Sequence, residues 1–157
     1  MFNKRLRFFP ILLIILVFSC SQKTTSNEKI QFVEDNTYFD VVSKNIIFDK
    51  SIPNDLQINF KNWFNNKVKT NGFDGKLILN ILNYKESISN LKNAKKIETT
   101  LNFSLNIFKD QENAKKTISG QIKSFGVIEG EFSLDDFDII INKTKLDLIK
   151  RLAKELK

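Results

Sequence analysis

The stretch IETTLNFSLNI, residues 97–107, carries the clearest structural signal in this chain of 157 residues. Its odd-numbered positions hold Ile, Thr, Leu, Phe, Leu and Ile, and its even-numbered positions hold Glu, Thr, Asn, Ser and Asn. A strict period of two over this length predicts a β-strand with one buried and one solvated face. The fold should therefore contain a sheet that is covered on one side only.

Three further segments have the composition of strands in the same sheet. Residues 38–48 (YFDVVSKNIIF) are rich in β-branched and aromatic side chains, and residues 117–128 follow a turn-like break after the central segment. Residues 77–84 (LILNILNY) are apolar on both faces, which predicts a place in the middle of the sheet.

The segment 117–128 has an irregular apolar pattern. Its inward-facing set changes along the segment, from Ile118 and Ile122 to Phe125 and Val127. A change of face within one strand predicts a bulge or bend, here near Gly120 or Gly126.

The first predicted helix follows residues 38–48. It carries an apolar stripe at steps of three and four residues, formed by Leu56, Phe60, Trp63, Phe64 and Val68. Asn71-Gly72 tolerates the left-handed conformation that ends a helix, so we expect the helix to stop there. Because Trp63 lies on the stripe, we assign it to the core rather than to an interface.

The second predicted helix begins at Ser133. Ser133 and Asp136 have the spacing of a capping box, and Phe132 and Phe137 that of a hydrophobic staple. This cap accounts for the acidic cluster Asp135, Asp136 and Asp138, so we expect no metal site there. The apolar stripe consists of Phe137, Ile141, Leu148, Leu152 and Leu156, with Ile140 and Ile149 beside it.

These elements follow the order β-α-β-β-β-α. A strand and a helix return to the next strand through a right-handed crossover, which makes the first two strands parallel. The later strands follow as an antiparallel meander. We therefore expect an α+β fold, a two-layer sandwich with a four-stranded mixed sheet and two helices on one face. An open face or an edge strand is where a partner is expected to bind.

The first 19 residues have the pattern of an export signal. Lys4, Arg5 and Arg7 precede an apolar run at 8–18 (FFPILLIILVF). As a helix this run is about 16 Å long, whereas a membrane span needs about 30 Å. The run therefore predicts a signal-peptide core rather than a permanent anchor.

The end of the leader, Val17-Phe18-Ser19-Cys20, resembles the lipobox of bacterial lipoprotein precursors. In that family the Cys thiol receives a diacylglyceryl group, the bond before the Cys is cut, and the new amino terminus is acylated. The resemblance implies a lipidated Cys20 that holds the protein on a membrane. Phe18 is bulkier than the residue usual before the Cys, and Val17 replaces the commoner Leu. Two alternatives stay open: ordinary signal-peptidase cleavage after Ser21, which leaves a soluble protein, and an uncleaved anchor with a free Cys20 thiol.

The leader divides the chain into three segments. We expect residues 1–19 to be a lipoprotein signal peptide, residues 20–36 to be the lipidated Cys and a flexible polar tether, and residues 37–157 to be a single α+β periplasmic domain. Ser21 rather than Asp follows the Cys, as in many outer-membrane lipoproteins. The expected location is the periplasmic face of the outer membrane, with the inner membrane as the alternative.

Composition excludes several classes of function. The chain has no His and one Cys, which removes His-based catalysis, internal disulfides and His or thiolate metal sites. It also lacks a glycine-rich phosphate-binding motif, so we expect no enzymatic activity, no catalytic residue, no metal and no cofactor. The net charge of +7 falls to +4 once the three basic residues of the leader are removed. With no aromatic-basic strand motif, we expect no nucleic-acid partner.

A group of lysines forms the second candidate site. Lys85, Lys92, Lys95 and Lys96 flank a predicted twelve-residue loop between the second and third strands. A loop of that length is more often functional than a tight hairpin turn. The lysines are candidate contacts for anionic lipid headgroups, lipopolysaccharide phosphates or a partner protein. The alternative is a solvated rim that protects sheet edges.

The leader and the order of elements resemble the lipopolysaccharide-assembly lipoprotein that plugs the outer-membrane translocon. Residues 63–79, with NGFDG before an apolar strand, are similar to uncharacterised lipoproteins of alphaproteobacteria. These resemblances imply a lipid-anchored accessory or scaffold protein that assists lipopolysaccharide or outer-membrane assembly and has an envelope protein partner. One alternative is a periplasmic lipoprotein that binds a lipid or small apolar ligand between sheet and helices. An envelope hydrolase has the least support, because no nucleophile and base can be paired.

Overall fold

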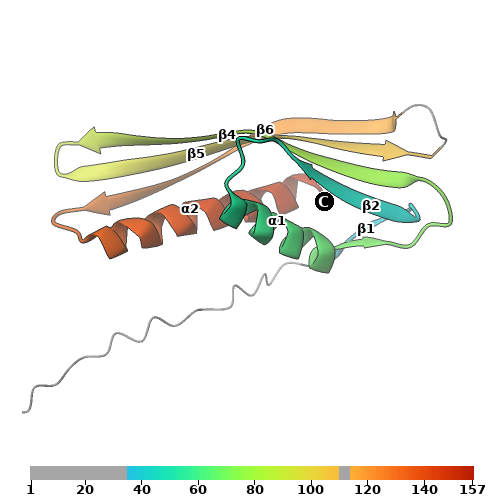
Figure 1. Cartoon of the computed structure of the whole chain (residues 1–157), viewed down its shortest axis with the longest axis horizontal. Helices are drawn as coiled ribbons and strands as arrows, with labels where there is room; N and C mark the ends of the chain where they lie inside the picture. Colours follow the sequence, from blue (N-terminus) through green and yellow to red (C-terminus); the bar gives the residue numbers. More distant parts are fainter. Residues whose placement is uncertain (1–34, 110–113) are drawn as a thin grey trace, which may run out of the picture. The chain divides into compact units, whose positions relative to one another are not determined.

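The computed structural model describes residues 35–109 and 114–157. The elements are β1 (Thr37–Phe39), β2 (Ser43–Phe48), α1 (Asn54–Lys67), β3 (Val68–Thr70), β4 (Lys76–Leu91), β5 (Ala94–Phe108), β6 (Ala114–Glu129) and α2 (Leu134–Glu155). The main sheet has the order β2-β4-β5-β6, with β2 parallel to β4 and the other pairs antiparallel. Both helices lie on one face of this sheet (Figure 1). The predicted α+β fold, with a four-stranded mixed sheet and two helices on one face, is confirmed.

The first predicted strand is divided into two. β1 pairs in parallel with β3, and β2 pairs in parallel with β4, so a second, two-stranded sheet is added to the predicted one. The chain turns between them because Val41 enters the core, where it is fully buried. The Val41 carbonyl accepts a hydrogen bond from the N–H of Gly72 at 3.1 Å.

Helix α1 ends at Lys67, before the Asn71-Gly72 pair that was expected to stop it. The ammonium group of Lys44, on β2, donates hydrogen bonds to the carbonyls of Phe64 (3.0 Å), Asn65 (3.1 Å) and Val68. A cation at this end of a helix interacts favourably with the last carbonyls, and here it adds to the hydrogen bond that the N–H of Val68 donates to Phe64. The helix therefore ends through a contact with a distant strand, which local sequence does not show.

The predicted long loop between the second and third strands does not exist. β4 and β5 stay paired from Lys76 opposite Phe108 to Leu91 opposite Ala94, so only two residues make the turn. The end of β4 lacks an apolar alternation because seven of its last eight residues are exposed in a row. A strand without cover has no face that must be apolar.

The predicted irregularity of β6 is wrong. Its pairing with β5 is continuous from Thr117 to Glu129, and Phe125 and Val127 are exposed on the open face. One register shift lies instead in β4, where Asn83 has a positive φ of 50°, and another lies at the start of β6, between Ala114 and Lys116.

The helix-facing side of β6 changes in character along the strand. Ile122 and Ser124 are buried there, and Gly126 lies close to α2. Ser124 and Gly126, a polar and a small residue, take inward positions beneath α2. The apolar alternation is therefore lost along this part of β6, although its pairing with β5 stays regular.

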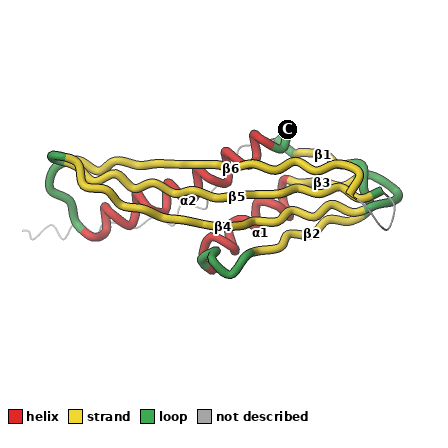
Figure 2. Tube along the Cα trace, turned by 90° about the horizontal axis from the view of Figure 1, so that it is seen from above, coloured by secondary structure: helices red, strands yellow, loops and turns green. Residues whose placement is uncertain are grey.

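The core lies between the sheet and the two helices. Phe60, Trp63 and Phe64 of α1 expose at most 1% of their surface, which confirms Trp63 as a core residue. From α2, Leu148 and Leu152 are fully buried. Seen from above, α2 runs obliquely beneath β5 and β6 (Figure 2). Over residues 35–109 and 114–157, no helix is both long and apolar enough to cross a membrane.

Candidate functional site

The candidate site is one end of the sheet. We call it the tip and define it as residues 87–98 and 125–140. It comprises the β4–β5 turn, the end of β6 and the start of α2. Figure 1 shows this end running past α1, so the helix layer over the tip is α2 alone. At the tip, the strands and α2 therefore expose surface that α1 covers elsewhere in the fold.

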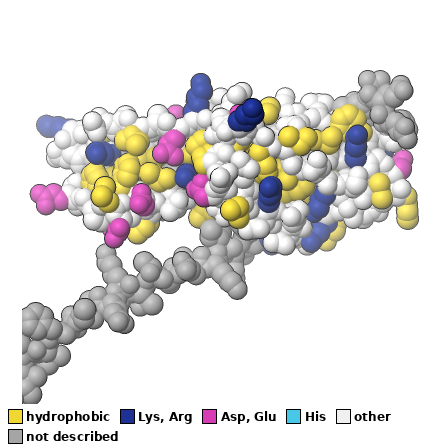
Figure 3. All heavy atoms as spheres, viewed as in Figure 1, with side chains coloured by type: hydrophobic (Ala, Val, Ile, Leu, Met, Phe, Trp, Pro, Cys, Tyr) yellow, Lys and Arg dark blue, Asp and Glu magenta, His cyan; other side chains and the backbone are white. Residues whose placement is uncertain are grey.

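Large apolar side chains are concentrated at the tip. Of the eleven that are strongly exposed among the described residues, the tip holds Ile88 (51%), Leu91 (51%), Phe125 (60%), Val127 (40%), Leu134 (82%) and Ile139 (62%). In Figure 3 hydrophobic side chains gather over the start of α2 and the strands beside it. Exposed apolar side chains gathered at one end of a small protein make that end a candidate interaction surface.

The hairpin register distributes these residues over both faces of the sheet. Leu91, Phe125 and Val127 lie on the open face, in the rows of Ala94, Glu98 and Lys96 respectively. Ile88 pairs with the buried Ile97 and lies on the helix side. The tip can therefore contact a partner on both of its faces.

The conformation at the start of α2 is stabilised by an N-terminal cap. The Ser133 hydroxyl accepts a hydrogen bond from the N–H of Asp136 at 3.2 Å, and the Asp136 carboxylate accepts one from the N–H of Ser133 at 3.1 Å. The predicted capping box is thereby confirmed. The rings of Phe132 and Phe137 stack with centroids 6.1 Å apart. The cap holds Leu134, which follows Ser133 directly, in its exposed position.

Two of the candidate lysines lie on aromatic rings. The Lys95 ammonium is 5.1 Å from the centroid of Phe132 and 5.7 Å from that of Phe137. On the other face, Lys96 lies 5.4 Å from the ring centroid of Phe125 and 2.8 Å from the Glu98 carboxylate. This hydrogen bond lowers the pKa of Glu98. Both cations are held in place rather than extended into solvent.

The other two candidate lysines differ in position. Lys92 lies exposed in the turn itself. Lys85 lies seven residues earlier on β4, opposite Thr100, which is about 23 Å along an extended strand. The structure thus gathers Lys92, Lys95 and Lys96 at the tip and leaves Lys85 outside it. Their role in contacts with lipid or a partner stays a prediction.

At the opposite end of the sheet, Lys109 lies between two carboxylates. There Lys109 is 2.6 Å from the carboxylate of Asp40 and 3.3 Å from that of Asp74. The hydrogen bond to Asp40 raises the pKa of Lys109. A basic side chain at this end is therefore neutralised by two acids, whereas Lys92 at the tip makes no ion pair within the described residues.

Two surface cavities adjoin α2. One, of about 320 Å³, is at the tip and is lined by Ile128, Phe132, Ile139 and Ile140, with acidic residues at its rim. The other, of about 610 Å³, lies between β6 and the end of α2 and has mostly charged walls. The alternative function places an apolar ligand between the sheet and the helices; beneath α1 this space is occupied by the side chains of Phe60, Trp63 and Phe64.

The sequence-predicted lipidation residue, Cys20, and the predicted signal peptide lie outside the described residues, as does nearly all of the tether at 20–36. Within residues 35–109 and 114–157, no group of three or more His, Cys, Asp or Glu side chains is placed to hold a metal ion.

Sequence reasoning missed Ile139. It belongs to the run Ile139-Ile140-Ile141, and a helix turns by about 100° per residue, so a single narrow stripe cannot hold all three. An apolar triplet in an amphipathic helix is a signal that one member faces solvent. The sequence of the exposed half of β4 contains no comparable signal for its exposed apolar residues.

Comparisons with known proteins add the fold relationship. No protein-family model matches the sequence, and no curated protein matches it. The structure is similar to that of a minor lipoprotein from Acinetobacter baumannii, with 14% identity, a TM-score of 0.52, and coverage of 74% of this chain and 92% of that one. It also matches rare lipoprotein B from Shewanella oneidensis, with 10% identity, a TM-score of 0.49, and coverage of 73% and 91%. The first likeness shows a shared fold.

Proposed function

We propose that this protein is a lipid-anchored, non-enzymatic accessory protein of the bacterial cell envelope, and that its tip binds an envelope partner protein. The observation that carries the proposal is the concentration of exposed apolar side chains at the tip, on both faces of the sheet. Leu91 and Leu134 are half or more exposed although each costs free energy in water, about 1.5–3 kcal/mol for a fully exposed side chain of this kind. Burial against a partner recovers that free energy.

The anchor in this proposal is Cys20. The lipobox-like leader supports it, and so does the shared fold with a protein that is itself described as a lipoprotein. Each acyl CH₂ group that enters the bilayer contributes about 0.8 kcal/mol, so two or three chains hold a protein on the membrane. The location we propose is the periplasmic face of the outer membrane.

A scaffold rather than an enzyme fits the composition of the whole chain. It contains no His to activate a nucleophile and one Cys, which the anchor uses. We further propose that the partner handles lipopolysaccharide or outer-membrane assembly. Lys92, Lys95 and Lys96 are the support for this, because an ammonium group can bind a lipid phosphate and two of the three lie beside aromatic rings. The acids of the β6–α2 turn and Glu98 outnumber these lysines at the tip, so the contact would be confined to the lysines of the β4–β5 turn.

The tip is tested by photo-crosslinking in intact cells, followed by identification of the captured protein. The test variant carries Leu91→Ser and Leu134→Ser, which remove apolar surface from the turn and from the start of α2. The control variant is Phe73→Ser, because Phe73 is 99% exposed and lies just before β4, at the other end of the sheet. We expect a defined envelope partner to be captured by the unmodified protein and by the control, and to be lost with the tip variant.

Two outcomes would contradict the proposal. Equal capture by the tip variant and the unmodified protein would show that the tip is not the contact surface. Release of the unmodified mature protein into the soluble periplasmic fraction would show that the anchor is absent. Lipid that co-purifies without any protein would favour a ligand carrier instead.

A further inference from the structure

The outer edge of β6 has the features of a strand-docking site. β6 is the last strand of the main sheet, and no described strand pairs with its outer side. At 16 residues it equals β4 as the longest strand, so a long row of backbone groups is presented. An unpaired edge of this kind is a template for another extended chain.

We propose that the β6 edge and the adjoining face of α2 bind an extended acidic segment of a partner protein as an added strand. The site is separate from the tip cavity and is built from residues 121–123 of β6 and from the residues of α2 that face them between 147 and 155. It goes beyond the proposed accessory role, and it does not depend on the lipid anchor.

The backbone pairing shows which β6 residues face outward. The N–H of Gly130 donates to the carbonyl of Asn93 at 3.0 Å, so even-numbered residues direct their backbone toward β5. The Ser124 carbonyl agrees, because it accepts a hydrogen bond from Thr99 of β5 at 3.4 Å. In an antiparallel pair, successive residues direct their N–H and C=O groups to opposite sides. Gln121 and Lys123 therefore present theirs to the free edge.

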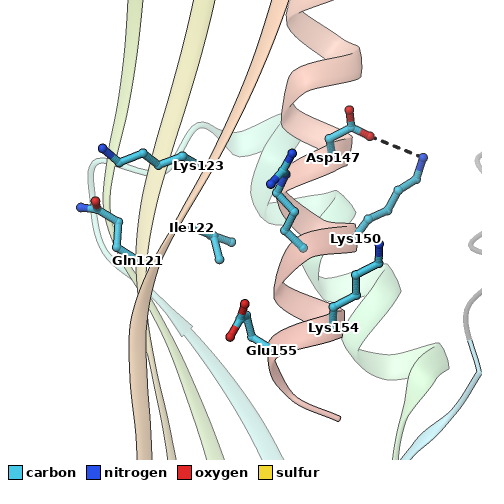
Figure 4. Close-up of a pocket in the computed structure, with 8 residues that line it drawn as sticks. Gln121, Ile122, Lys123, Asp147, Lys150, Lys154 and Glu155 are labelled. Atoms are coloured by element: carbon cyan, nitrogen blue, oxygen red, sulfur yellow. Dashed lines mark ion pairs between the residues drawn. The ribbon is translucent and has the colours of Figure 1, made fainter.

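A groove of about 610 Å³ runs along this edge. Residues 121–123 line it on one side, and α2 lines it on the other. Figure 4 shows Ile122 pointing toward α2, while Gln121 and Lys123 point to the opposite side of the strand. A docked strand would thus hydrogen-bond to β6 and lie with one face against the helix.

The groove carries excess positive charge. Its cations are Lys150, Arg151 and Lys154 of α2, and its anions are Asp147 and Glu155, whereas the Lys123 side chain points to the other side of the strand. Asp147 is paired with Lys150 at 3.5 Å, as Figure 4 shows. Within the described residues, neither Arg151 nor Lys154 makes an ion pair. Carboxylates on the incoming strand would supply their partners.

Charge and backbone hydrogen bonding favour an extended acidic peptide over two other binding partners, a second copy of the chain and an anionic membrane. A second copy of the chain would bring an identical basic groove against Arg151 and Lys154, and like charges oppose that pairing. An anionic membrane would satisfy the charges but offers no regular row of amide donors and acceptors for Gln121 and Lys123. An acidic peptide in an extended conformation satisfies both requirements.

The test uses fluorescence polarisation with full-length protein in mild detergent. The probe is a labelled octapeptide with Glu at alternate positions and Val between them. One control peptide has the same side chains and alternate N-methylated amides, which cannot pair with a strand. A second control replaces every Glu by Lys. We expect binding of the acidic probe and none of either control.

Two matched pairs of variants locate the site. Gln121→Pro removes the outward N–H without touching the β5 pairing, whereas Gln121→Ala loses the same side chain and keeps the N–H. We expect binding about fivefold weaker with Gln121→Pro than with Gln121→Ala, since one hydrogen bond contributes about 1 kcal/mol. Arg151→Gln with Lys154→Gln should weaken binding about tenfold. Lys143→Gln, an exposed α2 position outside the groove, should leave binding unchanged.

Several results would overturn the inference. Equal binding of the N-methylated peptide would show attraction by charge without strand pairing. Equal binding to Gln121→Pro and Gln121→Ala would remove the edge from the site. Absence of probe binding, together with charge-dependent binding to phosphatidylglycerol vesicles, would assign the groove to a membrane. If Gln121→Pro fails to fold, the double variant Arg151→Gln with Lys154→Gln still tests the site, because it changes only exposed side chains of α2.

Discussion

Gly126→Ala tests how α2 is seated on the sheet beside the tip. A Cβ added at Gly126 would lie 2.5 Å from Cγ2 of Ile140 and 3.1 Å from Cγ2 of Thr144. The first distance is about 0.9 Å short of the 3.4 Å at which ordinary contact begins. Ile140 cannot easily turn away, because a β-branched side chain in a helix has one strongly preferred rotamer. The helix itself must move.

The expected cost follows from two opposing effects. Alanine in a strand is favoured over glycine by about 0.5–1 kcal/mol, since it loses less conformational freedom on folding. Overpacking of one methyl group costs about 1–3 kcal/mol. We therefore expect a net loss of about 1 kcal/mol in the free energy of unfolding, and a melting temperature lower by about 4 °C.

A double-mutant cycle in urea separates this contact from other effects. Ile140→Ala removes the methyl group that the new Cβ would meet, so Gly126→Ala should be neutral or stabilising in that background. The interaction free energy should be about 1 kcal/mol or more. Gly120→Ala is the control on the same strand, because its Cβ would lie 3.1 Å from the edge of the Phe103 ring. A Gly126→Ala cost that is unchanged by Ile140→Ala would refute the reasoning.

Three other perturbations test the contacts that hold the elements together. Lys44→Met should lower the free energy of unfolding by about 1–2 kcal/mol, because it removes the charged donor that binds the carbonyls at the end of α1; urea titration measures this. Ser133→Ala should cost about 1 kcal/mol and speed amide exchange in the first turn of α2, since Asp136 loses its cap. Burial raises the pKa of Asp55, but the hydrogen bond and charge of Lys145, 2.9 Å away, outweigh it and lower the pKa overall. The stabilisation is present above the unfolded pKa and is lost as pH falls through the folded one, so Asp55→Asn should cost about 0.5 kcal/mol at pH 7 and nothing at pH 2.

The layer architecture could be predicted from the sequence, because the period of the apolar residues shows which face of an element is buried. Residues 97–107 alternate strictly, and in the structure their odd-numbered side chains from Ile97 to Leu105 are buried or nearly so beneath the helices. The cap of α2 was equally predictable, since Ser133 and Asp136 interact locally. Elements whose stability depends on neighbouring residues in the chain, or on one covered face, are the ones that a pattern can reveal.

The tip was hidden from pattern analysis for a physical reason. The last half of β4 is uncovered, so its side chains carry no periodic burial signal and resemble a loop. Its strand conformation comes from pairing with β5, which is a contact between segments rather than a local preference. Lys85 was consequently grouped with Lys92, although the strand separates them.

The predicted end of α1 was wrong for a related reason. Asn71-Gly72 has the composition of a helix stop, but Lys44 supplies the actual termination from a strand twenty residues or more earlier in the chain. Gly72 serves instead for a close approach, because a Cβ there would lie 2.5 Å from the backbone nitrogen of Val41. The residue type was informative, but its structural use depended on the tertiary contact.

The most direct measurement of the proposed function is mass spectrometry of the amino-terminal peptide of the mature protein, purified from membranes. A lipid-anchored accessory protein predicts a peptide that begins at Cys20 and carries a diacylglyceryl thioether and an acylated amino group. A peptide that begins at Gln22, or one that retains Met1 with an unmodified Cys20, would contradict the anchor and remove the basis for placing the tip at a membrane.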